Sequence, residues 1–133
     1  MVLNTRWPKW RMAERINADL YGVLPWVKGS PINVQNGSYT TVLLDEGKTI
    51  SKESGGAGET ITIDSNANVA YPVGAFIGFN NDGGGILTIA ITTDTLTWSA
   101  DNTTGSRTLA DGGYAVAQKV TTTGWKIAGK QIT

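Results

Sequence analysis

The pattern of hydrophobic and polar residues in the second part of the chain predicts β-strands. Residues 60–64 alternate strictly between polar and apolar side chains, which places Ile61 and Ile63 on the same face of a strand. Runs rich in β-branched and aromatic residues predict further strands. These lie at residues 39–44, 73–79, 86–92, 95–98, 114–120 and 124–127.

Turn residues between these runs indicate how the strands connect. The Gly-rich segment 80–85 favours a tight turn, so we expect residues 73–79 and 86–92 to form a hairpin. The last two predicted strands form a second hairpin that turns near residues 121–123. Residues 51–59 are rich in Gly and Ser and are predicted to be a flexible surface loop.

Short strands that recur about every 8–12 residues are typical of all-β domains. The composition agrees, because the chain contains 17 Gly in 133 residues and only 17% charged residues, below the usual share of about a quarter. No internal repeat is visible. The fold class is therefore predicted to be mainly β, a single antiparallel β-sandwich, jelly-roll or small barrel.

The segment before the predicted strands contains one predicted short helix. Pro8 suits the first turn of a helix, and Gly22 suits its end. Met12, Ile16 and Leu20 recur every four residues and would form one apolar stripe. A helix of roughly 12 residues is marginal alone in water, so it needs a surface to lie on.

Charge divides the chain near residue 30, although the net charge of the whole is zero. Residues 1–30 form a Trp-rich basic arm with five basic and two acidic residues, a net charge of +3. Residues 31–133 form the β domain, with six basic and nine acidic residues, a net charge of −3. A nucleic-acid-binding protein would normally carry a strong basic excess, so no nucleic-acid partner is expected.

The arm is the predicted partner-binding site. It holds three of the five Trp of the chain, and Trp and Arg are the residue types that dominate binding hot spots. Docking onto a partner chain is favoured, and the alternative is an arm that folds back over its own β domain. The candidate residues are Arg6, Trp7, Lys9, Trp10, Arg11, Arg15 and Trp26.

Catalytic chemistry is poorly supported by the residues present. The chain has no His and no Cys, which removes the commonest general base, the usual zinc ligands and cysteine nucleophiles. The loop at 55–58 lacks the residues of a phosphate-binding loop or a repeated calcium motif. We expect no enzymatic activity, catalytic residue, metal or cofactor. The acids Asp82, Asp94, Asp101 and Asp111 all lie in predicted turns, which Asp favours without any chemistry.

Two aromatic residues of the β domain could instead bind a sugar ring. Trp98 ends a predicted strand, and Tyr114 begins one. A strand Trp is more often part of a core or an interface, because Trp is usually well buried. Trp98 and Tyr114 are therefore kept as possible glycan-binding residues under an alternative function.

A series of turns and strands runs through residues 63–77, which contain Pro72-Val73-Gly74, and through residues 85–90, 108–110 and 125–129. This series resembles parts of the structural proteins of tailed bacteriophages. The resemblance covers roughly residues 60–130 and contains no catalytic motif. It implies a virion part, commonly a trimer, such as a tail fibre, a head fibre or a capsid decoration protein.

The short chain and its arm favour a capsid decoration (cement) protein that binds the outer capsid surface and stabilises the head. The resemblance implies partners among other virion proteins, first the major capsid protein, and a homo-oligomer with a trimer favoured over a dimer. The alternative is a tail-associated adapter or fibre domain that binds a host surface glycan. The chain has no early apolar segment and no run of about 20 apolar residues, so we expect no membrane partner and synthesis in the host cytoplasm.

Overall fold

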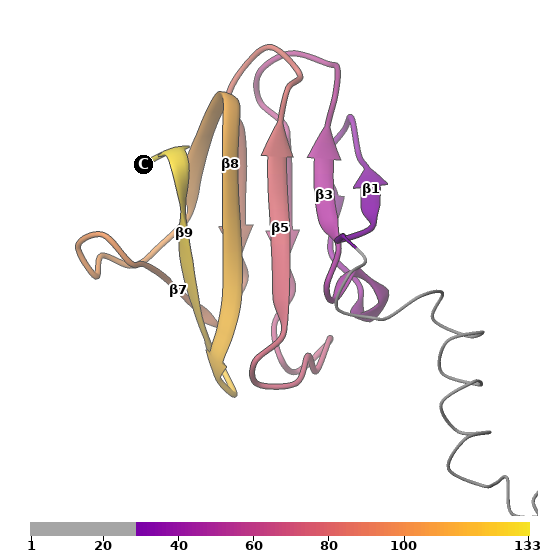
Figure 1. The fold of residues 1–133 in the computed structure, drawn as a ribbon. Helices are drawn as coiled ribbons and strands as arrows, with labels where there is room; N and C mark the ends of the chain where they lie inside the picture. The colour runs from indigo at the N-terminus through magenta and orange to yellow at the C-terminus, as the bar shows by residue number, and fades with distance from the viewer. Residues whose placement is uncertain (1–28) are drawn as a thin grey trace, which may run out of the picture. The chain divides into compact units, whose positions relative to one another are not determined.

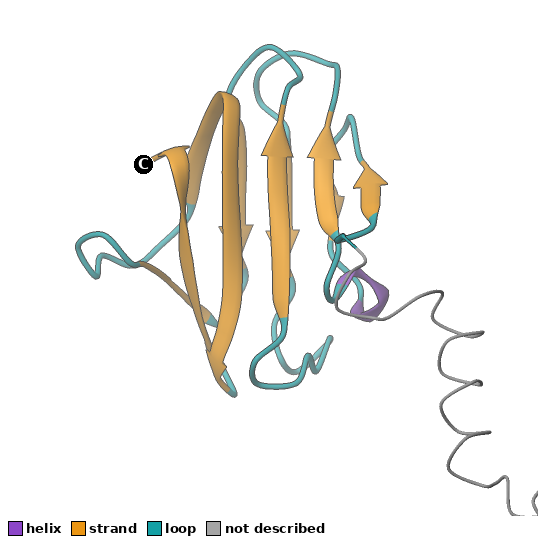
Figure 2. Cartoon of the chain, in the orientation of Figure 1, coloured by secondary structure: helices purple, strands orange, loops and turns teal. Residues whose placement is uncertain are grey.

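A computed structural model describes residues 29–133, and Pro31–Thr133 form one compact unit. The predicted helix of the arm lies outside the described residues. The unit is mainly β, as predicted, and its one helical element is a short 3₁₀ helix, η2 (Leu43–Asp45) (Figure 2). The strands are β1 (Ile32–Val34), β2 (Tyr39–Thr40), β3 (Thr49–Lys52), β4 (Thr60–Ile63), β5 (Phe76–Asn81), β6 (Leu87–Ile91), β7 (Thr95–Trp98), β8 (Arg107–Thr121) and β9 (Gly124–Ile132).

The nine described strands form one sheet that curls and stays open. Its main path follows the order β1-β3-β5-β8-β6-β4-β2. The chain alternates between two wings, so β1, β3 and β5 pair in parallel in the first wing. The second wing consists of β2, β4 and β6, which also pair in parallel. Figure 1 shows the first wing in front of the second.

Strand β8 joins the two wings. Its residues 107–109 pair antiparallel with β6, and its residues 113–118 pair antiparallel with β5. Between these two stretches Gly112 adopts a φ of 76°. A side chain at Gly113 would overlap Leu109 and the Ala110 carbonyl, so glycine allows the tight bend there. Strand β9 pairs with β8, and β7 pairs in parallel with β9.

A single hydrophobic core contains side chains from both wings and from the β8–β9 hairpin. Ile61 and Ile63 are both fully buried, which confirms the alternation predicted for this strand. Trp125 is 1% exposed, and its ring meets that of Tyr71 edge to face, with centroids 5.4 Å apart. The hairpin predicted at the C-terminal end is confirmed, with its turn between Thr121 and Gly124.

The predicted antiparallel arrangement is wrong, because five of the eight pairings between described strands are parallel. The predicted hairpin of residues 73–79 and 86–92 is also wrong. β5 and β6 lie in different wings, and each pairs with β8 instead of with the other. The Gly-rich segment between them is a crossover, which needs the same turn residues as a hairpin.

Two local predictions also need correction. Of the strand predicted at residues 39–44, only Tyr39 and Thr40 pair in the sheet, and the chain then enters η2. The loop predicted at 51–59 begins at residue 53 in the structure, because Ser51 and Lys52 belong to β3 and are buried. In each case, hydrogen bonds made by a buried charged side chain determine the local path, and periodicity does not report these bonds.

Candidate interaction surface

Two of the three edge strands of the described sheet lie at the start of the unit, and the third is β7, which pairs only with β9. We call residues 31–45 the open end, since they contain β1, β2 and η2. β1 and β2 are the terminal strands of the main strand path, and no described strand lies beyond either of them. Exposed strand edges are sites where a further strand can add. The open end therefore has main-chain groups that can bind another chain.

The exposed residues of the open end are largely apolar and carry no charge. Ten large hydrophobic residues are exposed in the described part of the chain, and half of them lie here. No charged residue occurs between residues 31 and 44, whereas the β domain as a whole contains 15. Exposed apolar patches with this character mark interaction sites. The exposed residues are Ile32, Val34, Val42, Leu43 and Leu44, of which Leu44 is the most exposed at 78%.

A buried carboxylate organises the open end. Asp45 is fully buried, and its Oδ1 accepts a hydrogen bond of 2.9 Å from Asn33 Nδ2 in β1. Its Oδ2 accepts from the Tyr39 hydroxyl in β2 at 2.8 Å and from the Val42 amide at 2.9 Å. The side chain thus ties both edge strands to η2. Burial, together with Asp45, raises the pKa of Tyr39 above its ordinary value.

Tyr71 supports the same region from the loop that follows β4. Its hydroxyl donates a 2.5 Å hydrogen bond to the Val42 carbonyl, and its ring packs against Trp125. Burial is the main cause that raises the pKa of Tyr71 to about 12. The neutral phenol is therefore the stable form, and the backbone at η2 has a fixed hydrogen-bond partner.

Trp98 and Tyr114, the two candidate glycan-binding residues, do not form one site. Trp98 lies opposite Ile127 and packs against the core, while the Arg107 guanidinium sits 5.5 Å from its ring centre. Tyr114 is 46% exposed on the other face of the sheet, because it lies three residues from the inward-facing Ala117 on a regular stretch of β8. The two aromatic rings therefore cannot contact one ligand together.

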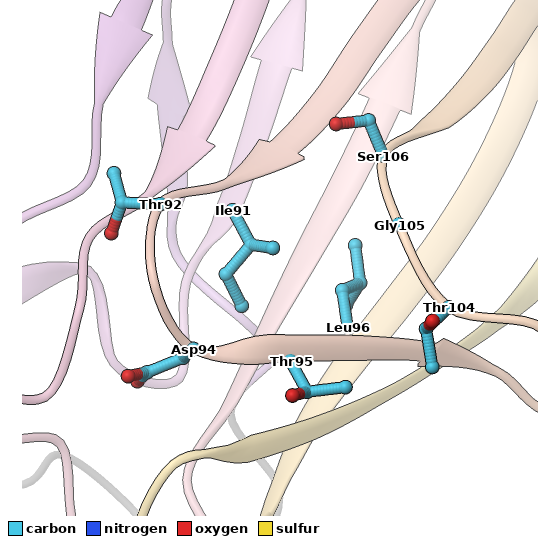
Figure 3. Close-up of a pocket in the computed structure, with 8 residues that line it drawn as sticks. All are labelled: Ile91, Thr92, Asp94, Thr95, Leu96, Thr104, Gly105 and Ser106. Atoms are coloured by element: carbon cyan, nitrogen blue, oxygen red, sulfur yellow. The ribbon is translucent and has the colours of Figure 1, made fainter.

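A shallow pocket lies between the end of β6 and β7 (Figure 3). Its volume is about 280 Å³, and Ile91 and Leu96 supply its apolar lining. Asp94 supplies the carboxylate of the pocket, and its Oδ2 accepts a hydrogen bond from the backbone N–H of Asn66. Most glycosidases use a pair of carboxylates, and the lining of this pocket contains one. The remaining lining residues are Thr92, Thr95, Thr104, Gly105 and Ser106.

Two buried lysines hold loops against the sheet, and sequence patterns did not reveal either of them as buried. Lys52 Nζ lies 3.2 Å from Glu59 Oε2. A hydrogen bond from the backbone amide of Glu59, followed by the one from Lys52, lowers the pKa of the Glu59 carboxyl. Lys119 donates to Asn66 Oδ1 at 2.6 Å and to the Tyr71 carbonyl at 2.9 Å. Strict alternation on β8 does place Lys119 on the face of Ala117, which is the signal that could have found it.

The remaining candidates from the sequence bring no catalytic constellation together in residues 29–133. Asp101 accepts hydrogen bonds from Thr103, as its predicted turn role requires, whereas Asp111 lies within β8 and accepts from the Gly84 amide. Within the described range, no group of three acidic, His or Cys side chains could hold a metal ion. No helix in that range is long and apolar enough to cross a membrane.

The seven partner-binding candidates of the arm lie outside the described residues. They are Arg6, Trp7, Lys9, Trp10, Arg11, Arg15 and Trp26.

Comparison with protein-family models, with curated proteins and with solved structures found no match for this chain.

Proposed function

We propose that this chain is a non-enzymatic structural protein of a bacteriophage virion, a decoration protein that binds the outer surface of the capsid. One observation carries the proposal, namely the open end, whose exposed residues carry no charge and include five apolar side chains. The basic Trp-rich arm and the resemblance of residues 60–130 to phage structural proteins support it. The partners in this proposal are the major capsid protein and further copies of the same chain.

The order within the open end favours binding over catalysis. Asp45 fixes both edge strands through three hydrogen bonds, so little conformational entropy remains to be lost on contact. Side chains from both wings share one core, and we propose that the wings act as the two layers of a sandwich-like platform. Such a platform would present the arm and the open end to neighbouring subunits.

The arm is tested by binding of the full chain to capsids of the phage that encodes it, stripped of this protein. A variant with Trp7, Trp10 and Trp26 all changed to Ala loses apolar contact area at three positions. Hot-spot residues contribute about 2 kcal/mol each or more, so we expect binding to fall at least 100-fold. Cryo-electron microscopy of the decorated particle is expected to place the protein on the outer shell.

A matched control changes Phe76 and Val73, which are exposed on the β domain outside both the arm and the open end, to Ala. This control variant should bind capsids like the unmodified chain. Full binding by the triple Trp variant, or density confined to the tail, would contradict the proposal.

The pocket between β6 and β7 keeps the glycan-binding alternative open, because its hydroxyl-rich lining suits a sugar. In that case the chain is a tail-associated adapter or fibre domain. A glycan array distinguishes the two functions, since only the alternative predicts a signal that Asp94→Asn and Ser106→Ala weaken. Trp98 and Tyr114 lie on opposite faces of the sheet and do not line this pocket.

A further inference from the structure

The hydrogen-bond pattern of β1 shows which of its backbone groups face outward. The Pro31 carbonyl accepts from the Thr49 amide, and the Gln35 amide donates to the Ser51 carbonyl. Odd-numbered residues of this segment therefore direct their main-chain groups toward β3. In a strand the direction alternates, so the N–H and C=O groups of Ile32 and Val34 face the free edge, the side of β1 on which no described strand lies.

Ile32 and Val34 also share one face of the strand, since they are two residues apart. Both side chains are exposed, and both are β-branched. The free edge therefore offers two N–H groups, two C=O groups and two apolar side chains from the same pair of residues. Asn33, between them, turns its side chain to Asp45 and holds the strand in place.

This arrangement is complementary to itself. If a second β1 runs antiparallel across a twofold axis at Asn33, Ile32 of each copy faces Val34 of the other. Each such pair can exchange two main-chain hydrogen bonds, and the apolar side chains meet across the strands. A twofold interface places the same patch on both sides, so like charges normally oppose it. Residues 31–44 carry no charge, and β1 has none of the charged residues that usually protect an edge strand.

We propose that two copies of this chain associate through their β1 strands, with Ile32 of one copy opposite Val34 of the other, so that the first wings join into one continuous sheet. This inference rests on the part of the proposed function in which copies of the chain associate, and it names the residues in contact. The β1 contact joins two copies, whereas the resemblance to phage structural proteins favours a trimer. Val42, Leu43 and Leu44 lie in the same open end and add apolar area beside the paired strands.

The register can be tested with cysteines, because the chain has none of its own. Ile32→Cys and Val34→Cys are made as separate full-length proteins. Opposed residues in a hydrogen-bonded antiparallel pair have Cα atoms about 5.5 Å apart, within the range of a disulfide. Equivalent residues of the two copies are offset along the strands and lie more than about 7 Å apart. Mild oxidation should therefore crosslink the mixture of the two variants, and each variant alone should stay uncrosslinked.

A charge variant tests the association itself. Ile32→Lys with Val34→Lys places four like charges at the proposed contact without touching the core, and sedimentation should show dimer formation weakened at least tenfold. Val73→Lys with Val120→Lys, at exposed positions outside the open end, is the matched control and should leave the dimer intact. A full chain that is monomeric at all concentrations overturns the inference, as does a dimer that ignores the β1 charges or lacks the mixed crosslink. A β1 dimer that does not bind capsids leaves this inference standing and removes the proposed function.

Discussion

The two ends of the sheet differ in which of their large and charged side chains are buried. At the closed end, which comprises β7, β8, β9 and the loop 64–75, Val73, Tyr114 and Val120 are exposed, but the largest side chain of the core is buried and even a lysine is enclosed. Trp125 and Lys119 are each 1% exposed there. At the open end the large apolar side chains of η2 point outward, and the charged residue of that segment, Asp45, is the one that is buried.

The open end is ordered although most of its large apolar side chains lie outside the core. An exposed edge strand with apolar residues and no charge can pair with another chain, and monomeric proteins usually avoid such edges. Three hydrogen bonds to Asp45 nevertheless keep the edge strands in position. The closed end contributes the largest buried side chains, and the open end holds its exposed apolar residues in a fixed arrangement, as the proposed contact surface requires.

The largest expected effect is at the closed end. Trp125→Ala removes a fully buried ring that packs against Tyr71 and lies 6.0 Å from the Lys119 ammonium. We expect the free energy of unfolding to fall by about 3–5 kcal/mol, as for other buried aromatic residues. Urea denaturation of the full chain measures this. Phe76→Ala, at an exposed ring, is the control, and equal losses for the two variants would contradict the described core.

The next effect breaks the order of the open end. Asp45→Ala leaves the Tyr39 hydroxyl, the Asn33 amide and the Val42 N–H without their acceptor. The donors are partly buried, and each hydrogen bond to the carboxylate of the buried Asp45 contributes about 1.5–3 kcal/mol, so we expect a net loss of about 3 kcal/mol in unfolding free energy.

Asp101→Ala is the matched control for this variant, since Asp101 makes its hydrogen bonds on the exposed surface. It should cost less than about 1 kcal/mol. Hydrogen exchange should show faster exchange at the open end in Asp45→Ala alone, and unchanged exchange there would contradict the role given to Asp45.

The contrast also explains what could be predicted from the sequence. Alternation found Ile61 and Ile63, and the C-terminal hairpin was found because its strands are adjacent in the chain and in the sheet. The two wings were missed because β1, β3 and β5 pair across 17 or more residues, and periodicity carries no information on partners so distant. Lys52 falls in the predicted loop, and nothing in the pattern indicates that Lys52 or Asp45 is buried, because the type of a charged residue does not show its burial.

Tyr71 connects the two ends, and alkaline pH tests that connection. Its pKa is raised to about 12 in the folded chain, against 10.0 for an ordinary tyrosine. The folded state thus holds this proton more tightly, so the stabilisation is complete below pH 10 and is lost as the pH rises toward 12. The loss of stability attributable to Tyr71 is at most about 2.7 kcal/mol, because each of the two pKa units corresponds to about 1.4 kcal/mol.

Tyr71→Phe should be less stable at neutral pH, because the hydrogen bond to the Val42 carbonyl is gone. Its stability should then fall less steeply between pH 10 and pH 12 than that of the unmodified chain. Urea denaturation at a series of pH values gives both slopes, and parallel slopes would show that the Tyr71 phenol is not held in its neutral form by the fold.

The smallest expected effect on stability is at the most exposed apolar residue of the open end. Leu44→Ser changes a side chain that is 78% exposed, so the free energy of unfolding should change by no more than about 0.5 kcal/mol. If the open end is a contact surface, the same variant should still weaken self-association or capsid binding. A near-zero effect on folding together with a measurable effect on binding separates the surface from the core. A loss of stability comparable to that of Trp125→Ala would mean that Leu44 belongs to the core, and the two ends would then no longer differ.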